Sequence, residues 1–118
     1  MDTRTKIIDL DRAKTLAAHR PLILAHGPFD VLLVNHTHAL SRLRSPDSTL
    51  LVVVYQDAPL LNAQARAQLV AALACVDYVL VWPESSLHTL LRDLRPTRVE
   101  QVPDERNIIV EIQKRYVG

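Results

Sequence analysis

Residues 22–40 read LILAHGPFDVLLVNHTHAL, and this stretch decides the fold. An apolar run ends at His26-Gly27-Pro28, a turn follows, and polar residues from Asn35 to His38 mark the start of a helix. The unpaired N–H groups and the dipole of a first helical turn attract phosphate, so a strand, a glycine-bearing loop and a helix in this order suit an anion. We therefore expect the ligand site at the end of this strand.

The rest of the chain alternates predicted helices with predicted strands. Strands are expected over residues 22–25, 50–55, 77–82 and, more weakly, 99–102. Helices are expected over residues up to 19, 36–44, 63–74, 86–94 and from 103 onward. The expected N-caps are Asp9 or Asp11, Asn35, Asn62, and Ser85 or Ser86.

Residues 50–55 read LLVVVY, and such a run is typical of a strand buried on both faces of a parallel sheet. Short connections between alternating helices and strands favour right-handed crossovers. We predict an α/β fold, a three-layer α/β/α sandwich with a Rossmann-like parallel sheet of about four to five strands, forming a single domain over residues 1–118. Ligands bind such sheets where the strand order reverses. The segments 26–27 and 102–104 should therefore face each other across one crevice.

The composition excludes several classes of partner. The 118 residues carry 14 Lys and Arg against 13 Asp and Glu, and a net charge of +1 gives no reason to expect nucleic acid or a membrane surface as partner. No run approaches the ~20 apolar residues of a membrane span, and no export signal is seen. The lone Cys75 favours a reducing, cytoplasmic setting and lies in an apolar segment typical of the core. No Cys/His cluster suggests a protein-bound metal, and His26, His36 and His38 have no fixed ligand geometry.

Four features in order and spacing identify a resemblance. They are G-x-F-D at residues 27–30, a histidine at His36, an arginine at Arg66 and V-D-Y-V at residues 76–79. With the surrounding residues they resemble the cytidylyltransferase-like family of nucleotidyltransferases, and most of all its heptose 1-phosphate adenylyltransferase and glycerol-3-phosphate cytidylyltransferase members. The resemblance covers most of the chain.

The resemblance implies transfer of a nucleotidyl group from CTP or ATP to a sugar or polyol phosphate, with release of pyrophosphate. It implies Mg²⁺ on the triphosphate if the protein is active, and it implies His36 and Arg66 as catalytic residues. The residues that it places near nucleotide or phosphate are His26, Gly27, Pro28, Phe29, Asp30, Asn35, His38 and Arg106.

The chain departs from the family pattern H-x-G-H at two positions, because Leu33 replaces the first histidine and Asn35 replaces the glycine. A leucine cannot donate a hydrogen bond to an oxyanion. The family places serine and threonine before its last helix, where residues 104–106 read DER. Two carboxylates there repel a triphosphate, and Arg106 offsets part of that repulsion.

Three hypotheses follow. The first is a pared-down nucleotidyltransferase with little or no catalysis that at most binds nucleotide or phosphate. The second is an active nucleotidyltransferase in which His36, His38 and Arg66 suffice. The third is a homodimeric or partner-binding scaffold without a ligand.

Individual residues also have simpler interpretations. Asp30 is expected to hold its loop through backbone N–H groups rather than to act as a base. Arg66 either faces an acceptor phosphate or is a surface arginine on an alanine-rich helix. His36 either donates to a phosphate or is an exposed or capping residue. Trp82 either lines the crevice or packs in the core.

Overall fold

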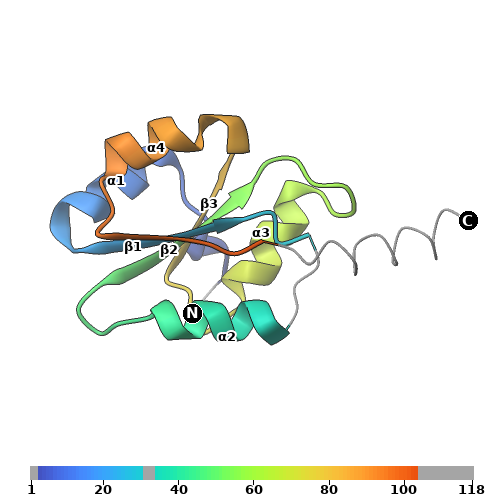
Figure 1. The fold of residues 1–118 in the computed structure, drawn as a ribbon, viewed down its shortest axis with the longest axis horizontal. Helices are drawn as coiled ribbons and strands as arrows, with labels where there is room; N and C mark the ends of the chain where they lie inside the picture. Colours follow the sequence, from blue (N-terminus) through green and yellow to red (C-terminus); the bar gives the residue numbers. More distant parts are fainter. Residues whose placement is uncertain (1–2, 31–33, 104–118) are drawn as a thin grey trace, which may run out of the picture.

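A computed structural model describes residues 3–30 and 34–103 of the chain. Its sheet has four parallel strands in the order β3-β2-β1-β4 (Figure 1). The strands are β1 (Leu22–Gly27), β2 (Thr49–Tyr55), β3 (Tyr78–Trp82) and β4 (Arg98–Gln101). Strands β1 and β2 are buried throughout, as their apolar runs predict for central parallel strands. The predicted parallel α/β sheet is confirmed.

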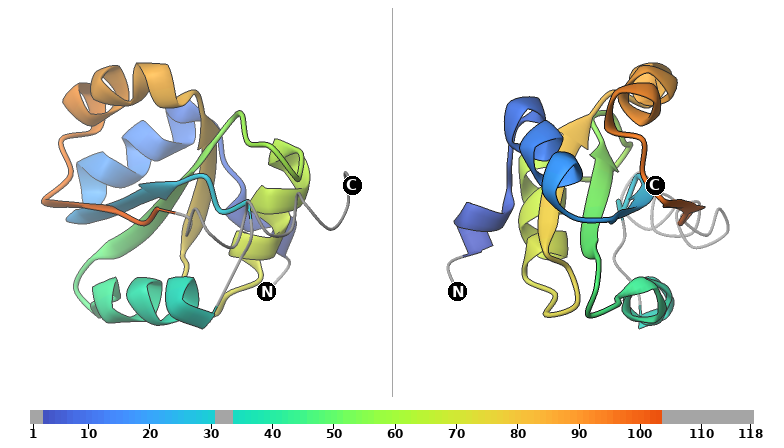
Figure 2. Two further views of the ribbon diagram at one scale, coloured as in Figure 1. Left: turned by 45° about the vertical axis from the view of Figure 1, so that its right-hand side comes forward. Right: turned by 90° about the vertical axis from the view of Figure 1, so that its left-hand side faces the viewer.

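Helices cover both faces of the sheet. They are the 3-10 turns η1 (Thr3–Lys6) and η2 (Glu84–Ser86) and the helices α1 (Leu10–His19), α2 (Val34–Leu43), α3 (Ala63–Ala71) and α4 (Leu87–Leu94). Helices α1 and α4 lie on one face, and α2 and α3 lie on the other (Figures 1 and 2). The predicted three layers are therefore present.

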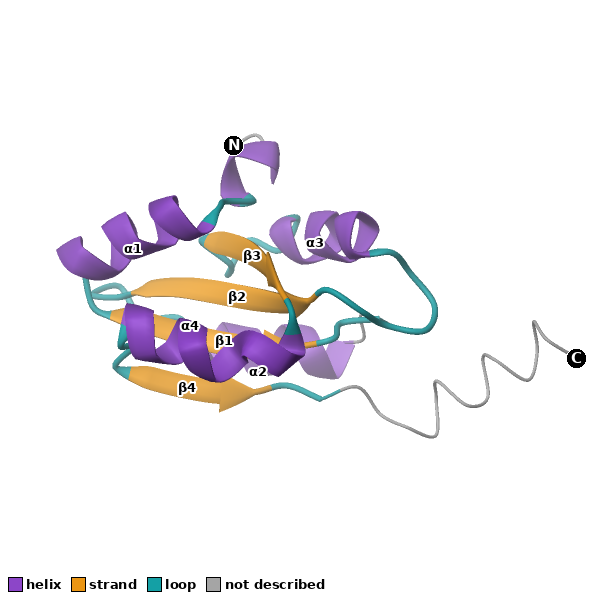
Figure 3. Cartoon of the chain, turned by 90° about the horizontal axis from the view of Figure 1, so that it is seen from above, coloured by secondary structure: helices purple, strands orange, loops and turns teal. Residues whose placement is uncertain are grey.

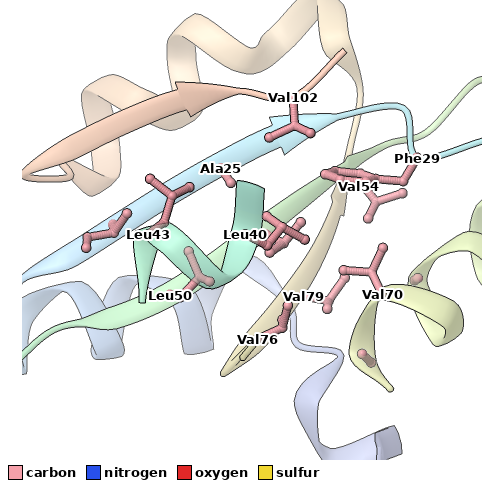
Figure 4. Packing of buried hydrophobic residues seen from close by; sticks show 14 residues of the cluster. Ala25, Phe29, Leu40, Leu43, Leu50, Val54, Val70, Val76, Val79 and Val102 are labelled. Atoms are coloured by element: carbon pink, nitrogen blue, oxygen red, sulfur yellow. The ribbon is translucent and has the colours of Figure 1, made fainter. Parts of the chain in front are cut away.

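Side chains of β1 alternate between two hydrophobic cores because successive residues of a strand point to opposite faces. Ile23 and Ala25 belong to the core under α2 and α3, and Leu22 and Leu24 belong to the core under α1 and α4. In the first core, Leu40 and Leu43 of α2 reach the sheet beside Ala25 and Leu50 (Figure 4). This packing fixes where α2 begins relative to the end of β1.

Two of the predicted N-caps are confirmed. The Asp9 carboxylate accepts a hydrogen bond from Arg12 N at 2.9 Å, and the Asn62 side chain accepts one from Ala65 N at 2.8 Å. The prediction that Asn35 caps its helix is wrong, because α2 already begins at Val34 and Asn35 lies in its first turn. The Ser86 side chain makes no capping bond, because η2 runs directly into α4 and Leu87 N donates to Glu84 O.

Several element ends differ from the predicted ones. Strand β1 runs on to Gly27, because it pairs with β2 on one side and approaches β4 on the other. Helix α3 ends at Ala71 rather than residue 74, where tighter bonds such as Leu73 N to Val70 O, 3.1 Å, turn the chain back toward β3. Strand β3 begins one residue late, because the Asp77 carboxylate accepts a hydrogen bond from Leu50 N. The predicted last helix lies outside the described residues, and so do residues 104–106.

In residues 3–30 and 34–103, no helix has both the length and the apolar character that a bilayer span requires.

Candidate functional site

The strand order reverses between β1 and β4, since the chain steps from β1 to β2 on one side and returns to pair with β4 on the other. Parallel sheets bind ligands beyond the carboxyl ends of the strands at such a point. The two strands lie side by side (Figure 3), with His26 opposite Gln101 and with Val102 N donating to His26 O at 2.8 Å. The predicted crevice between the first and fourth strands therefore has its two strand ends in contact.

Gly27 is needed at this point because β4 comes so close to it. A Cβ atom added at Gly27 would overlap the carbonyl oxygen of Val102. That oxygen belongs to the backbone and cannot rotate away as a side chain could. The structure thus gives Gly27 a packing role between β1 and β4, and its predicted contact with nucleotide stays a prediction.

The loop after β1 is held by Phe29 and Asp30, which are both buried. Phe29 adopts a left-handed backbone with φ of 49°, and its ring is part of the core beside Val54 (Figure 4). The Asp30 carboxylate accepts hydrogen bonds from Leu60 N and Leu61 N, both at 2.7 Å. The structural role expected for Asp30 is confirmed, and the loop that it binds is the one after β2.

Arg66 is fully buried, with 0% of its surface exposed, so the prediction of a surface arginine is wrong. Its guanidinium donates to the carbonyl oxygen of Pro28 at 2.8 Å and to that of Tyr55. It also donates to the carbonyl oxygens of Gln56 at 2.8 Å and Leu61 at 2.9 Å. The planar fork of donors therefore joins the loops after β1 and β2. A catalytic role for Arg66 stays a prediction, and this conformation gives the side chain a positioning role.

The three polar residues predicted at the start of α2 have different surroundings. His36 is buried, so the exposed alternative is wrong, and its ring meets that of Phe29 edge to face with centroids 6.0 Å apart. Asn35 and His38 are exposed. Contacts of all three with phosphate stay predictions.

His26 forms a pair with Tyr55 that the sequence did not suggest. The two residues are 29 positions apart, and His26 Nδ1 lies 2.7 Å from the Tyr55 hydroxyl. Burial lowers the pKa of His26, and the charge of Glu84 partly opposes this shift. Burial and the Glu84 charge both raise the pKa of Tyr55. Both groups are therefore held in their neutral forms near pH 7.

A cavity of about 370 Å³ runs between α2 and β4. Its polar lining includes Asn35, His36, Arg42, Arg98, Glu100 and Gln101. Of the described residues predicted for the site, Asn35 and His36 line this cavity, whereas His26, His38 and Arg66 do not. Arg42 and Arg98 were missed in the sequence, since they lie 56 positions apart by number and only the pairing of β4 with β1 brings them together.

The described residues do not gather a metal site: within 3–30 and 34–103, no group of three His, Cys, Asp or Glu side chains is placed to hold an ion. Asp30, the carboxylate nearest the start of α2 in sequence, already accepts two backbone N–H bonds.

Comparison with known proteins agrees with this geometry. The fold is shared with a lipopolysaccharide core biosynthesis protein from Thermoplasma volcanium, which matches with a TM-score of 0.62 and 23% identity over 82% of this chain and 89% of that one. This match places the chain among Rossmann-like α/β proteins with a parallel sheet.

Sequence relatives narrow the class. The chain is 36% identical to D-beta-D-heptose 1-phosphate adenylyltransferase from Bordetella bronchiseptica, over 74% of this chain and 64% of that protein. It is 32% identical to the bifunctional protein HldE from Geobacter sulfurreducens, over 80% of this chain and 22% of that protein. The protein of the same name from Helicobacter pylori is 30% identical over 80% of this chain and 23% of its own length. The chain thus spans less than a quarter of these two HldE proteins. No protein-family model matches it.

These relatives confirm the resemblance to the cytidylyltransferase-like nucleotidyltransferases. The chain is a homologue of heptose 1-phosphate adenylyltransferases and is nucleotidyltransferase-like.

Proposed function

We propose that this chain binds a nucleotide, ATP or CTP, in the cavity between α2 and β4 and that it transfers the nucleotidyl group weakly or not at all. The observation that carries the proposal is the position of this cavity at the β1–β4 switch, with polar residues of the first turn of α2 and two arginines in its lining.

Three properties of the cavity suit a nucleotide. Its volume of about 370 Å³ lies in the range of small-molecule sites. The amino end of α2 supplies the positive end of a helix dipole near Asn35 and His36. Arg42 and Arg98 supply guanidinium groups, which bind phosphate oxygens in pairs of hydrogen bonds. Glu100, 3.7 Å from Arg98, offsets part of that charge.

Weak transfer follows from the work that the candidate catalytic groups already do. Transfer requires donors placed where charge develops on the reacting phosphate. The Arg66 donors are bound to backbone carbonyls, and the His36 ring is packed on Phe29. Leu33 stands where the family has its first histidine and cannot donate.

The homologues suggest the co-substrate. The Bordetella relative is named for D-beta-D-heptose 1-phosphate, so a phosphorylated sugar is the acceptor to test first. Because the described residues form no ion site of their own, Mg²⁺ would be held chiefly by the phosphates of the nucleotide. The metal would neutralise phosphate charge there.

Titration calorimetry with ATP and with CTP tests the binding step. We expect saturable binding that Arg42→Gln weakens, while Arg92→Gln leaves it unchanged because Arg92 lies on α4, on the other face of the sheet. No saturable heat at millimolar nucleotide would overturn the proposal.

Pyrophosphate release tests the transfer step, with Mg²⁺, ATP and D-beta-D-heptose 1-phosphate. We expect release far below the usual turnover of about 1–10³ per second, and an increase in the double variant L33H/N35G, which restores the family's H-x-G-H pattern. Wild-type turnover within that range would show that the enzyme is active and that the second half of the proposal is wrong.

A further inference from the structure

A second cavity lies at the opposite end of the sheet. It has a volume of about 370 Å³, and its walls include Thr49 and Tyr78, the first residues of β2 and β3. Strand β2 has seven residues, which places its two ends about 20 Å apart. This amino-end cavity is therefore separate from the one between α2 and β4.

Three cations from different segments line the amino-end cavity. Lys6 comes from η1, Arg12 from α1 and Arg20 from the residue that ends α1. Asp77 is the one acidic residue in the lining, so the cavity has an excess of two positive charges. The net charge of the whole chain is only +1, so this excess is local.

The carboxylate does not neutralise these cations. One Asp77 oxygen accepts from Leu50 N at 2.9 Å, and the other lies 4.0 Å from the guanidinium of Arg44, which is outside the lining. Among the residues that the structure describes, Lys6, Arg12 and Arg20 form no ion pair with a carboxylate.

The cations keep donors for a ligand. Lys6 is only 9% exposed, and its ammonium group, which has three N–H donors, donates to Leu73 O at 3.1 Å. The Arg20 guanidinium donates to Pro46 O at 2.8 Å through one of its nitrogens. The Arg12 guanidinium lies 6.0 Å from the centre of the Tyr78 ring, which holds it over the cavity wall by a cation–π contact.

We propose that the cavity formed by Lys6, Arg12, Arg20, Thr49 and Tyr78 binds a small organic phosphate at the amino end of the sheet. Two guanidinium groups and a nearly buried ammonium group suit the doubly charged phosphate, since arginine binds phosphate oxygens in pairs of hydrogen bonds. The volume leaves room for a sugar-sized group beside the phosphate. This site stands independently of nucleotide binding at the carboxyl end.

The test is a titration of the full chain with ribose 5-phosphate, followed by ¹H–¹⁵N NMR. We expect saturating shifts of the amides of Lys6, Thr49 and Tyr78, and none with ribose. Arg12→Gln should weaken the affinity by about tenfold or more, because it removes charge-assisted hydrogen bonds. Lys14→Gln on the exposed side of α1 is the matched control and should change the affinity by less than about twofold, since solvent screens its charge.

The variants separate folding from binding. In the described residues, the Arg12 guanidinium makes the contact with Tyr78 and no side-chain hydrogen bond, so Arg12→Gln should fold with an unchanged melting temperature. Arg20→Gln provides a second loss of charge at the same cavity. Three results would overturn the proposal: no shift at millimolar ribose 5-phosphate, equal weakening by Lys14→Gln, or inorganic phosphate binding as tightly as ribose 5-phosphate.

Discussion

At the scale of single residues, buried polar groups hold the candidate site together. Arg66 donates to the backbone of the loops after β1 and β2, and Asp30 accepts from the second of these loops. Both residues are buried, so each bond replaces water that the backbone groups would otherwise bind. The shape of the loops at the carboxyl edge therefore depends on two charged side chains.

Arg66→Met should lower the free energy of unfolding by about 3–5 kcal/mol, because it leaves four buried carbonyl oxygens without a donor. Urea denaturation measures this change. Arg92→Met on the exposed side of α4 is the control and should cost less than about 0.5 kcal/mol. An Arg66→Met protein of unchanged stability that no longer binds nucleotide would instead support the phosphate-facing role.

His26 predicts how stability depends on pH. Its pKa in the folded protein is lowered from the usual value of 6.5, so the unfolded chain binds the proton more readily. The stabilisation is complete above pH 6.5 and is lost as the pH falls toward the pKa of the folded protein. Melting temperatures measured between pH 8 and pH 5 should fall less steeply in His26→Gln than in the wild type. The same slope in both proteins would contradict the shift.

At the scale of elements, the contact between β1 and β4 and the end of α4 are the places where backbone geometry restricts the sequence. Gly27 lets β4 approach, and Arg95 ends α4 in the left-handed conformation, with φ of 48° and ψ of 58°. A side chain is disfavoured in both places, yet only the first carries glycine.

Gly27→Ala should destabilise the fold by about 1–3 kcal/mol, because the added methyl group must displace the backbone of Val102. Hydrogen exchange of Val102 N, which donates to His26 O, should speed up in the same variant. Unchanged exchange would mean that β4 does not depend on this close approach.

Arg95→Gly should raise the free energy of unfolding by about 0.5 kcal/mol, since glycine removes the left-handed penalty but loses more chain entropy on folding. Arg92→Gly, inside the same helix, should lower it by about 1 kcal/mol. Thermal unfolding of the pair gives both signs, and a loss of stability in Arg95→Gly would contradict the backbone assignment.

At the scale of the whole molecule, alternating helices and apolar strands predict the layers, the parallel sheet and the point where strand order reverses. Local pattern decides these features. The buried role of Arg66 could not be predicted, because its four acceptors come from loops that only tertiary packing brings together. The His26–Tyr55 pair and the three cations of the amino-end cavity depend in the same way on contacts between distant segments.

The central claim is that nucleotide binds at the β1–β4 switch, and NMR titration with ATP measures it most directly. We predict saturating shifts of the amides of Gly27, His36, Arg98 and Val102, which surround or adjoin the cavity between α2 and β4. Arg42→Gln should weaken these shifts, and Arg92→Gln should not. Amides at this edge that stay unchanged at millimolar ATP would contradict the claim.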